Sequence, residues 1–218
     1  MDYSGPDASD FADVAALNHA FLMRLRSTAG ANLRERLPQR LRPAVAALRD
    51  VQVERLATTP FLLLTLRERD ADYWKRLVGE DGFPDLFATA TDGADDIVAA
   101  ALSFLWHLAR RNPYALRLLA GAANDWCATL AGSTLLELVR RASARPDILL
   151  PREADNHEFW RKLLGPGLSS DASVRSAAHT ACLQTMLTGL PESVPILRAA
   201  ARRSQPPRYR TAAIRRPG

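Results

Sequence analysis

Apolar residues recur every three or four positions along much of the chain, the spacing that places them on one face of an α-helix. The first such stripe predicts a helix capped by Ser9 or Asp10, whose side-chain oxygens can accept from the free N–H groups of the first turn. It consists of Val14, Leu17, Phe21 and Leu25. The longest stripe predicts a helix over about 95–111. This pattern predicts an all-α protein.

Capping residues and helix breakers divide the rest of the chain into shorter predicted helices. Asp70 or Asp72 begins a helix that contains Trp74 and ends at Gly79, and Asp171 begins another. Further helices are predicted to start at Pro43, at Asn112-Pro113, at Ser133 or Thr134, within 155–158 and at Pro191.

The run Phe61-Leu62-Leu63-Leu64-Thr65-Leu66 is apolar without a period, so a buried helical turn and a short strand fit it equally well. A strand needs a partner to be stable. Because no second strand candidate stands out, the sequence favours a helix here.

One stretch occurs twice. Tyr73-Trp74-Lys75-Arg76-Leu77-Val78-Gly79 is echoed by Phe159-Trp160-Arg161-Lys162-Leu163-Leu164-Gly165, 86 positions later. Weaker echoes pair the stretch that begins at Asn18 with one that begins at Asn112, and 54–63 with 139–150. Three matches in the same order favour a duplication, although capped helices that end in Gly also look alike by chance.

The echo predicts a bundle built from two similar helical repeats, 12–111 and 112–201, packed as one body. A flexible arm of residues 1–11 would precede them, and a disordered basic tail of residues 202–218 would follow. Trp74 and Trp160 are the predicted structural anchors of the repeats, because a buried indole covers a large apolar area.

Composition matches an ordinary globular protein: 47% of the 218 residues are hydrophobic and 24% are charged. No apolar run approaches the ~20 residues that span a bilayer. The acidic N-terminus does not resemble a secretory signal, and the two cysteines, Cys127 and Cys182, form no motif. We therefore expect a cytoplasmic protein with no membrane span.

Charge is concentrated at one end. From Arg198 onward there are seven arginines and no acid, which leaves 22 Lys and Arg against 24 Asp and Glu in the rest. The tail could contact nucleic acid through its arginines, with Tyr209 stacking on a base. The candidate interaction residues are Arg202, Arg203, Arg208, Tyr209, Arg210, Arg215 and Arg216. The alternatives are a solvated terminus, since the chain has 27 Arg but two Lys, or contact with an acidic protein or membrane surface.

No motif for catalysis, metal binding or nucleotide binding is present, so the sequence predicts no cofactor and no metal. Asp155-Asn156-His157-Glu158 is the densest group of potential ligands, but acids and Asn are also favoured at a helix start. Helix capping explains Asp95-Asp96 in the same way.

A series of apolar positions carries a resemblance to a known family. The positions are Leu17-Asn18, Phe21-Leu22, Leu25, Leu48, Val53, Leu56-Ala57, Leu62, Leu64 and Arg67. They resemble the D subunit of the flagellar master transcriptional activator over residues 17–70: a helix that opens with an Asn and aliphatics, a leucine-alanine helix, and an apolar run that ends in arginine. The resemblance implies a helical, oligomeric bacterial regulator that acts through a partner subunit. The apparent second copy and the Trp helices depart from that family.

Together these patterns predict a non-enzymatic helical module for interaction or regulation that binds another protein, with a homo-oligomer as one form of that partnership. The alternative is a transcription-associated DNA-binding regulator that uses the basic tail. An enzyme is the third hypothesis.

Overall fold

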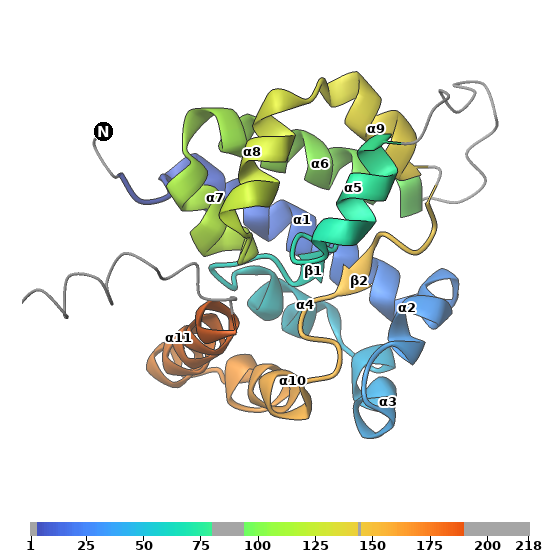
Figure 1. Cartoon of the computed structure of the whole chain (residues 1–218). Helices are drawn as coiled ribbons and strands as arrows, with labels where there is room; N and C mark the ends of the chain where they lie inside the picture. The colour runs from blue at the N-terminus through green and yellow to red at the C-terminus, as the bar shows by residue number, and fades with distance from the viewer. Residues whose placement is uncertain (1–3, 80–93, 144, 190–218) are drawn as a thin grey trace, which may run out of the picture.

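The computed structural model describes residues 4–79, 94–143 and 145–189, and the fold is all-α as predicted (Figure 1). The helices of the N-terminal half are α1 (Ala8–Arg26), η1 (Thr28–Gly30), α2 (Ala31–Glu35), η2 (Gln39–Leu41), α3 (Arg42–Ala46), α4 (Asp50–Ala57) and α5 (Ala71–Gly79). Those that follow are α6 (Ala94–Arg111), α7 (Pro113–Ala120), α8 (Asn124–Gly132), α9 (Leu135–Ser143), α10 (His157–Leu164), η3 (Pro166–Leu168) and α11 (Ala172–Thr188).

The two longest of the described helices, α1 and α6, lie against each other in the middle of the molecule. On its other sides α1 packs against α4, and α6 packs against α8 and α9. Helices α10 and α11 pack together with η3 and form the lower layer in Figure 1. One continuous apolar core connects these elements, from Val14 in α1 to Met186 in α11.

Most predicted capping residues act as caps. Side-chain oxygens of Asp70, Asn112 and Asn156 each accept from the backbone N–H three residues later, at 3.0 Å, and Asp171 caps α11. The first helix is an exception, because Asp7 rather than Ser9 or Asp10 is its cap. Asp7 and Asp10 form a reciprocal capping box, so residues 8–11 belong to α1 and the predicted arm of 1–11 is too long.

The prediction of a helix at Phe61–Leu66 is wrong. This segment is not helical, and its residues Leu64–Thr65 (β1) pair antiparallel with Leu150–Pro151 (β2). We call this pair the ribbon. The sequence did not indicate a strand at β2, because β2 is short and ends in Pro. Proline cannot donate a ladder hydrogen bond and is tolerated only at the edge of a sheet or at strand ends.

A buried asparagine holds the segment before β1 in place. Asn18 in α1 is fully buried, and its side-chain N–H donates to the carbonyl of Phe61 at 2.9 Å. Its side-chain oxygen accepts from the Leu63 N–H at 2.7 Å. Asn18 thus offers this backbone the donor and acceptor that a neighbouring strand would supply.

The two Trp segments share a detailed local geometry. Trp74 is 2% exposed and Trp160 is fully buried, and each indole N–H donates to a carbonyl eight residues earlier, at 3.0 and 2.8 Å. Arg67 and Glu153, 86 residues apart, are the two described non-glycine residues with positive φ. Each strand of the ribbon is therefore followed by a residue with positive φ, a side-chain helix cap and a hydrogen bond from the indole N–H.

Beyond this unit the two halves differ. Trp74 packs edge-on against Trp126, with ring centroids 5.4 Å apart, whereas α10, which carries Trp160, packs on α11 and η3. Asn18 lies buried within α1 while Asn112 caps α7, so that part of the echo pairs unlike positions. Two complete repeats remain a prediction, and residues 190–201 of the second lie outside the described chain.

Replacing Asn18 with Asp tests the role of this side chain. A carboxylate can accept from the Leu63 N–H but cannot donate to the Phe61 carbonyl, and it carries a charge into the core. We expect the free energy of unfolding in urea to fall by about 3 kcal/mol at pH 7. Asn32→Asp makes the same change on the exposed face of α2 and should have little effect. Equal losses in the two variants would contradict this role.

Candidate functional site

A buried ion pair crosses the ribbon. Arg152 and Glu68 are each 2% exposed, and Arg152 Nη2 lies 2.5 Å from Glu68 Oε1. Arg152 also donates to the carbonyls of Leu62 and Leu64, at 2.5 and 2.7 Å. Glu68 accepts from the Leu66 N–H at 2.8 Å. Because a buried ion is costly unless it is paired and hydrogen-bonded, this network fixes the backbone on both sides of β1.

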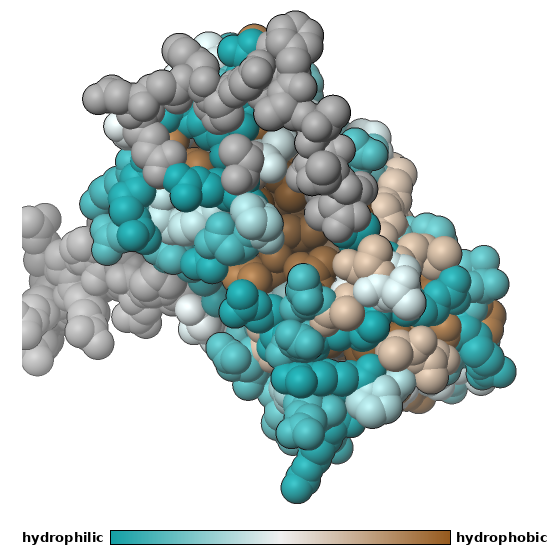
Figure 2. All heavy atoms as spheres, turned by 90° about the vertical axis from the view of Figure 1, so that its right-hand side faces the viewer, coloured by the Kyte–Doolittle hydropathy of each residue, from teal (hydrophilic) through white to brown (hydrophobic). Residues whose placement is uncertain are grey.

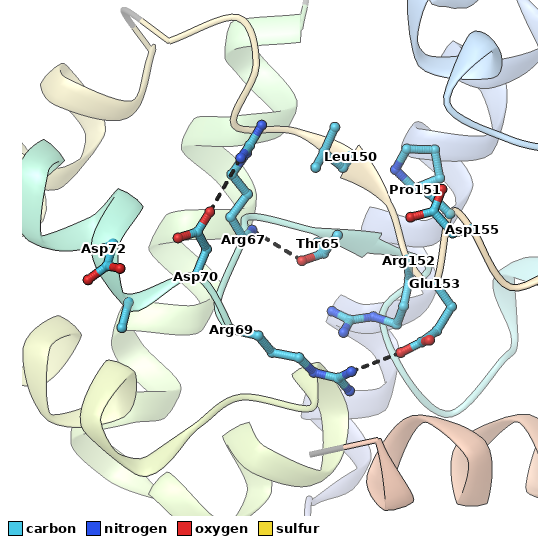
Figure 3. A pocket seen from close by; sticks show the side chains of 12 residues that line it. Thr65, Arg67, Arg69, Asp70, Asp72, Leu150, Pro151, Arg152, Glu153 and Asp155 are labelled. Carbon is cyan, nitrogen blue, oxygen red and sulfur yellow. Dashed lines mark hydrogen bonds and ion pairs between the residues drawn. The ribbon is translucent and has the colours of Figure 1, made fainter. Parts of the chain in front are cut away.

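The two described non-glycine residues with positive φ send their side chains across the ribbon. Arg67 (φ 58°) follows β1 and reaches Asp147, before β2, with Nη2 and Oδ2 3.3 Å apart. Glu153 (φ 48°) follows β2 and pairs with Arg69 at 3.0 Å. Figure 3 shows the Arg69–Glu153 pair at one end and the Arg67–Asp70 pair at the other, with Thr65 between them. Such backbone costs about 1–3 kcal/mol, so the surrounding contacts must hold it.

Three neighbouring recesses share lining residues, and we refer to them together as the ribbon groove. The ribbon recess, of about 700 Å³, has the charged lining residues Arg67, Arg69, Arg152, Asp70, Asp72, Glu153 and Asp155. The central recess, of about 240 Å³, is lined by Arg67, Tyr73, Arg76, Leu77, Arg145 and Asp147. The outer recess, of about 460 Å³, is lined by Asn32, Glu35, Arg36, Pro146 and Asp147. Arg67 joins the first two and Asp147 the last two.

The walls of the groove come from segments far apart in the chain. Helices α2 and α5 and the segments on either side of β2 all contribute to it. Figure 2 shows the side of the molecule on which α2, α5 and α9 lie in Figure 1, and there apolar surface gathers in a band between hydrophilic regions. The groove therefore depends on the ribbon, which brings these segments together.

The central recess is rich in hydrogen-bond donors. The Arg67 guanidinium lies over the Tyr73 ring, 4.7 Å from its centroid, and the Tyr73 hydroxyl donates to Asp147 at 3.3 Å. Burial, together with the nearby Asp147 carboxylate, raises the pKa of Tyr73 to about 12. The hydroxyl consequently stays protonated at physiological pH and remains a donor.

The other clear pKa shifts of buried groups lie away from the groove lining. Burial raises the pKa of the Cys127 and Cys182 thiols to about 11, so both stay protonated. Burial also lowers the pKa of His179, which keeps this imidazole neutral near pH 7. These shifts reflect packing in the core.

Of the sequence-predicted site residues that the structure describes, one lines the groove. Asn156 caps α10, and Asp155 lines the ribbon recess as an exposed side chain. Within the described residues no group of three His, Cys, Asp or Glu side chains is arranged to hold a metal ion. All seven candidate tail residues, from Arg202 to Arg216, lie outside the described chain.

Sequence reasoning missed the residues that build the groove. Glu68 and Arg152 are 84 positions apart and Arg67 and Asp147 are 80 apart, so only the pairing of β1 with β2 brings them together. One signal was available: the Trp echo aligns Arg67 with Glu153, the residues that turn the chain after each strand.

Comparisons with protein-family models, with characterised proteins and with solved structures found no match for this chain. In the described parts of the chain, no helix is both long enough and apolar enough to cross a membrane.

A double-mutant cycle on Glu68 and Arg152 tests the buried pair. Glu68→Gln keeps the shape but leaves the Arg152 charge buried, and we expect the free energy of unfolding in urea to fall by about 3–5 kcal/mol. The double variant Glu68→Gln/Arg152→Met should lose less free energy of unfolding than the two single variants lose in sum, by at least about 1 kcal/mol. The same Glu→Gln change at Glu158, which pairs with Arg161 on the surface, should leave the midpoint almost unchanged. Strictly additive losses would contradict the pairing.

Proposed function

We propose that this protein is a non-enzymatic helical interaction module that binds a segment of another protein in the ribbon groove. The observation that carries the proposal is the groove itself: three recesses that share lining residues, walled by elements from both halves of the chain, with exposed charges of both signs. Small-molecule pockets are mostly apolar with few polar groups. A surface this rich in charged side chains suits a polypeptide, whose backbone and side chains offer donors and acceptors along its length.

The hydrogen bonds around the groove also favour binding over chemistry. Arg69, Arg152 and Glu68 hold backbone carbonyls or N–H groups in place, and so act as supports of the groove. A preformed surface of this kind loses little conformational entropy when a partner binds. The resemblance of residues 17–70 to a regulator that acts through a partner subunit points in the same direction.

Site-specific photocrosslinking in the native host tests this function. A benzoylphenylalanine at Asp155, which is exposed in the ribbon recess, should capture one partner protein, and the same residue at Glu54, exposed on α4, should not. Arg76→Glu, in the central recess, should abolish the Asp155 crosslink because the partner occupies the whole groove. Arg40→Glu, exposed on η2 outside the groove, should preserve it. Equal capture from positions 155 and 54, or a crosslink from position 155 that Arg76→Glu does not reduce, would contradict groove binding.

The alternative function, DNA binding through the basic tail, rests on the seven arginines from Arg198 onward. It requires that affinity for duplex DNA fall steeply with salt. Replacing these seven arginines with Gln in the full chain should then remove the binding, while the groove variants should not affect it.

A further inference from the structure

The buried face of α11 contains one titratable ring. Its buried residues are Ala178, His179, Cys182 and Met186, and His179 is 5% exposed. The imidazole packs on the backbone of η3, so closely that a methyl group added at Gly167 would lie 3.5 Å from His179 Nε2. This nitrogen is removed from solvent and has no hydrogen-bond partner. A neutral ring thus fills the contact between α11 and η3, at a place where a charged ring would lose its hydration.

The charged groups around this contact are cations. Arg175, one turn earlier on α11, donates to the Ser169 carbonyl at 2.8 Å. From α4, the Arg55 guanidinium reaches the other side of η3 and donates to the Leu168 carbonyl at 3.0 Å. Lys162 belongs to α10, and its carbonyl lies against η3. Helix η3 itself is Pro-Gly-Leu and has no titratable side chain. Within the described chain no carboxylate forms an ion pair with His179, so nothing there compensates an added positive charge.

The position of α11 is therefore linked to proton uptake. Burial lowers the pKa of His179 below its ordinary value, a nearby backbone group of Gly167 offsets part of this effect, and Arg175 adds to it. A released α11 exposes the ring, which then titrates near its ordinary pKa of about 6.5. The seated helix keeps its full stability above that pH and loses stability as the pH falls from there toward the lowered pKa, because only the released state takes up the proton.

The far end of α11 reaches the ribbon recess. Arg69 Nη2 donates to the Met186 carbonyl at 2.7 Å, and Arg69 Nη1 pairs with Glu153 at 3.0 Å. Arg69 and Glu153 both line the ribbon recess (Figure 3). A change in the position of α11 consequently removes one of the contacts that hold the Arg69 side chain there.

We propose that His179 is a pH-sensitive latch: protonation of its imidazole at mildly acidic pH releases α11 from η3 and α10, and with it the Met186 carbonyl from Arg69. The latch is a property of the fold and goes beyond the proposed function. Partner capture in the ribbon groove at neutral pH can succeed or fail whether or not the latch exists.

The buried thiol of Cys182 reports the release, because it lies on the same face of α11 as His179. The full-length protein is treated with 4,4′-dithiodipyridine, a disulfide that thiols attack even at acidic pH. The rate at each site, resolved by mass spectrometry, is divided by the rate of an unstructured peptide that contains the same cysteine. For Cys182 this ratio should rise about tenfold between pH 7.5 and pH 5.5, as uptake of one proton near pH 6.5 requires. Cys127, buried in α8, should react more slowly than Cys182 at pH 5.5.

Two variants assign the response to the latch. His179→Gln cannot titrate, so its Cys182 ratio should change less than about twofold over the same range. His107→Gln, exposed on α6, should keep the tenfold rise. A Cys182 ratio that does not rise in the wild type, a rise that persists in His179→Gln, or equal rates at Cys182 and Cys127 would overturn the proposal.

Nuclear magnetic resonance decides the case if His179→Gln does not fold. In the wild-type protein the ring signals of seated His179 should remain those of a neutral imidazole at pH 5.5. A ring that becomes protonated near pH 6.5 while α11 stays seated would overturn the latch, because protonation would then not require release.

Discussion

The structure depends on one buried ion pair. Arg152 follows β2 and Glu68 follows β1, so the pair links the two strands, and its charges are almost fully removed from water. Such a pair persists only where other hydrogen bonds satisfy its remaining donors and acceptors, and here backbone groups around β1 do so. The ribbon is two residues long and could not be stable alone. Side chains from the helical layers supply what the short strands lack.

The groove is a consequence of the link between β1 and β2. Because β1 and β2 are held together, the turn after each strand places a charged side chain on the other half of the molecule: Arg67 on Asp147, and Glu153 on Arg69. The Trp that follows each turn then fastens its helix to the strand through the indole N–H. A wall of the ribbon groove from each half is thereby fixed in position.

Helical periodicity and capping residues were sufficient to predict the all-α class, the long helix near 95–111 and most helix starts, because these features depend on neighbours within a few residues. The strand at Leu64–Thr65 was not predictable in this way, since its support comes from Asn18, 45 residues away, and from Arg152. The groove was missed for the same reason. The Trp echo indicated a repeated unit, but it could not show that the two units meet at their strands.

The central claim is that the ribbon and its ion pair hold the two halves together as one cooperative body. Native-state hydrogen exchange of the full-length protein measures this directly at three groups: the Arg152 amide, which donates to Leu63, and the indole N–H groups of Trp74 and Trp160. We predict that all three exchange only through global unfolding, with the same free energy as urea denaturation gives. Exchange of either indole or of the Arg152 amide by a much smaller local opening would contradict the account.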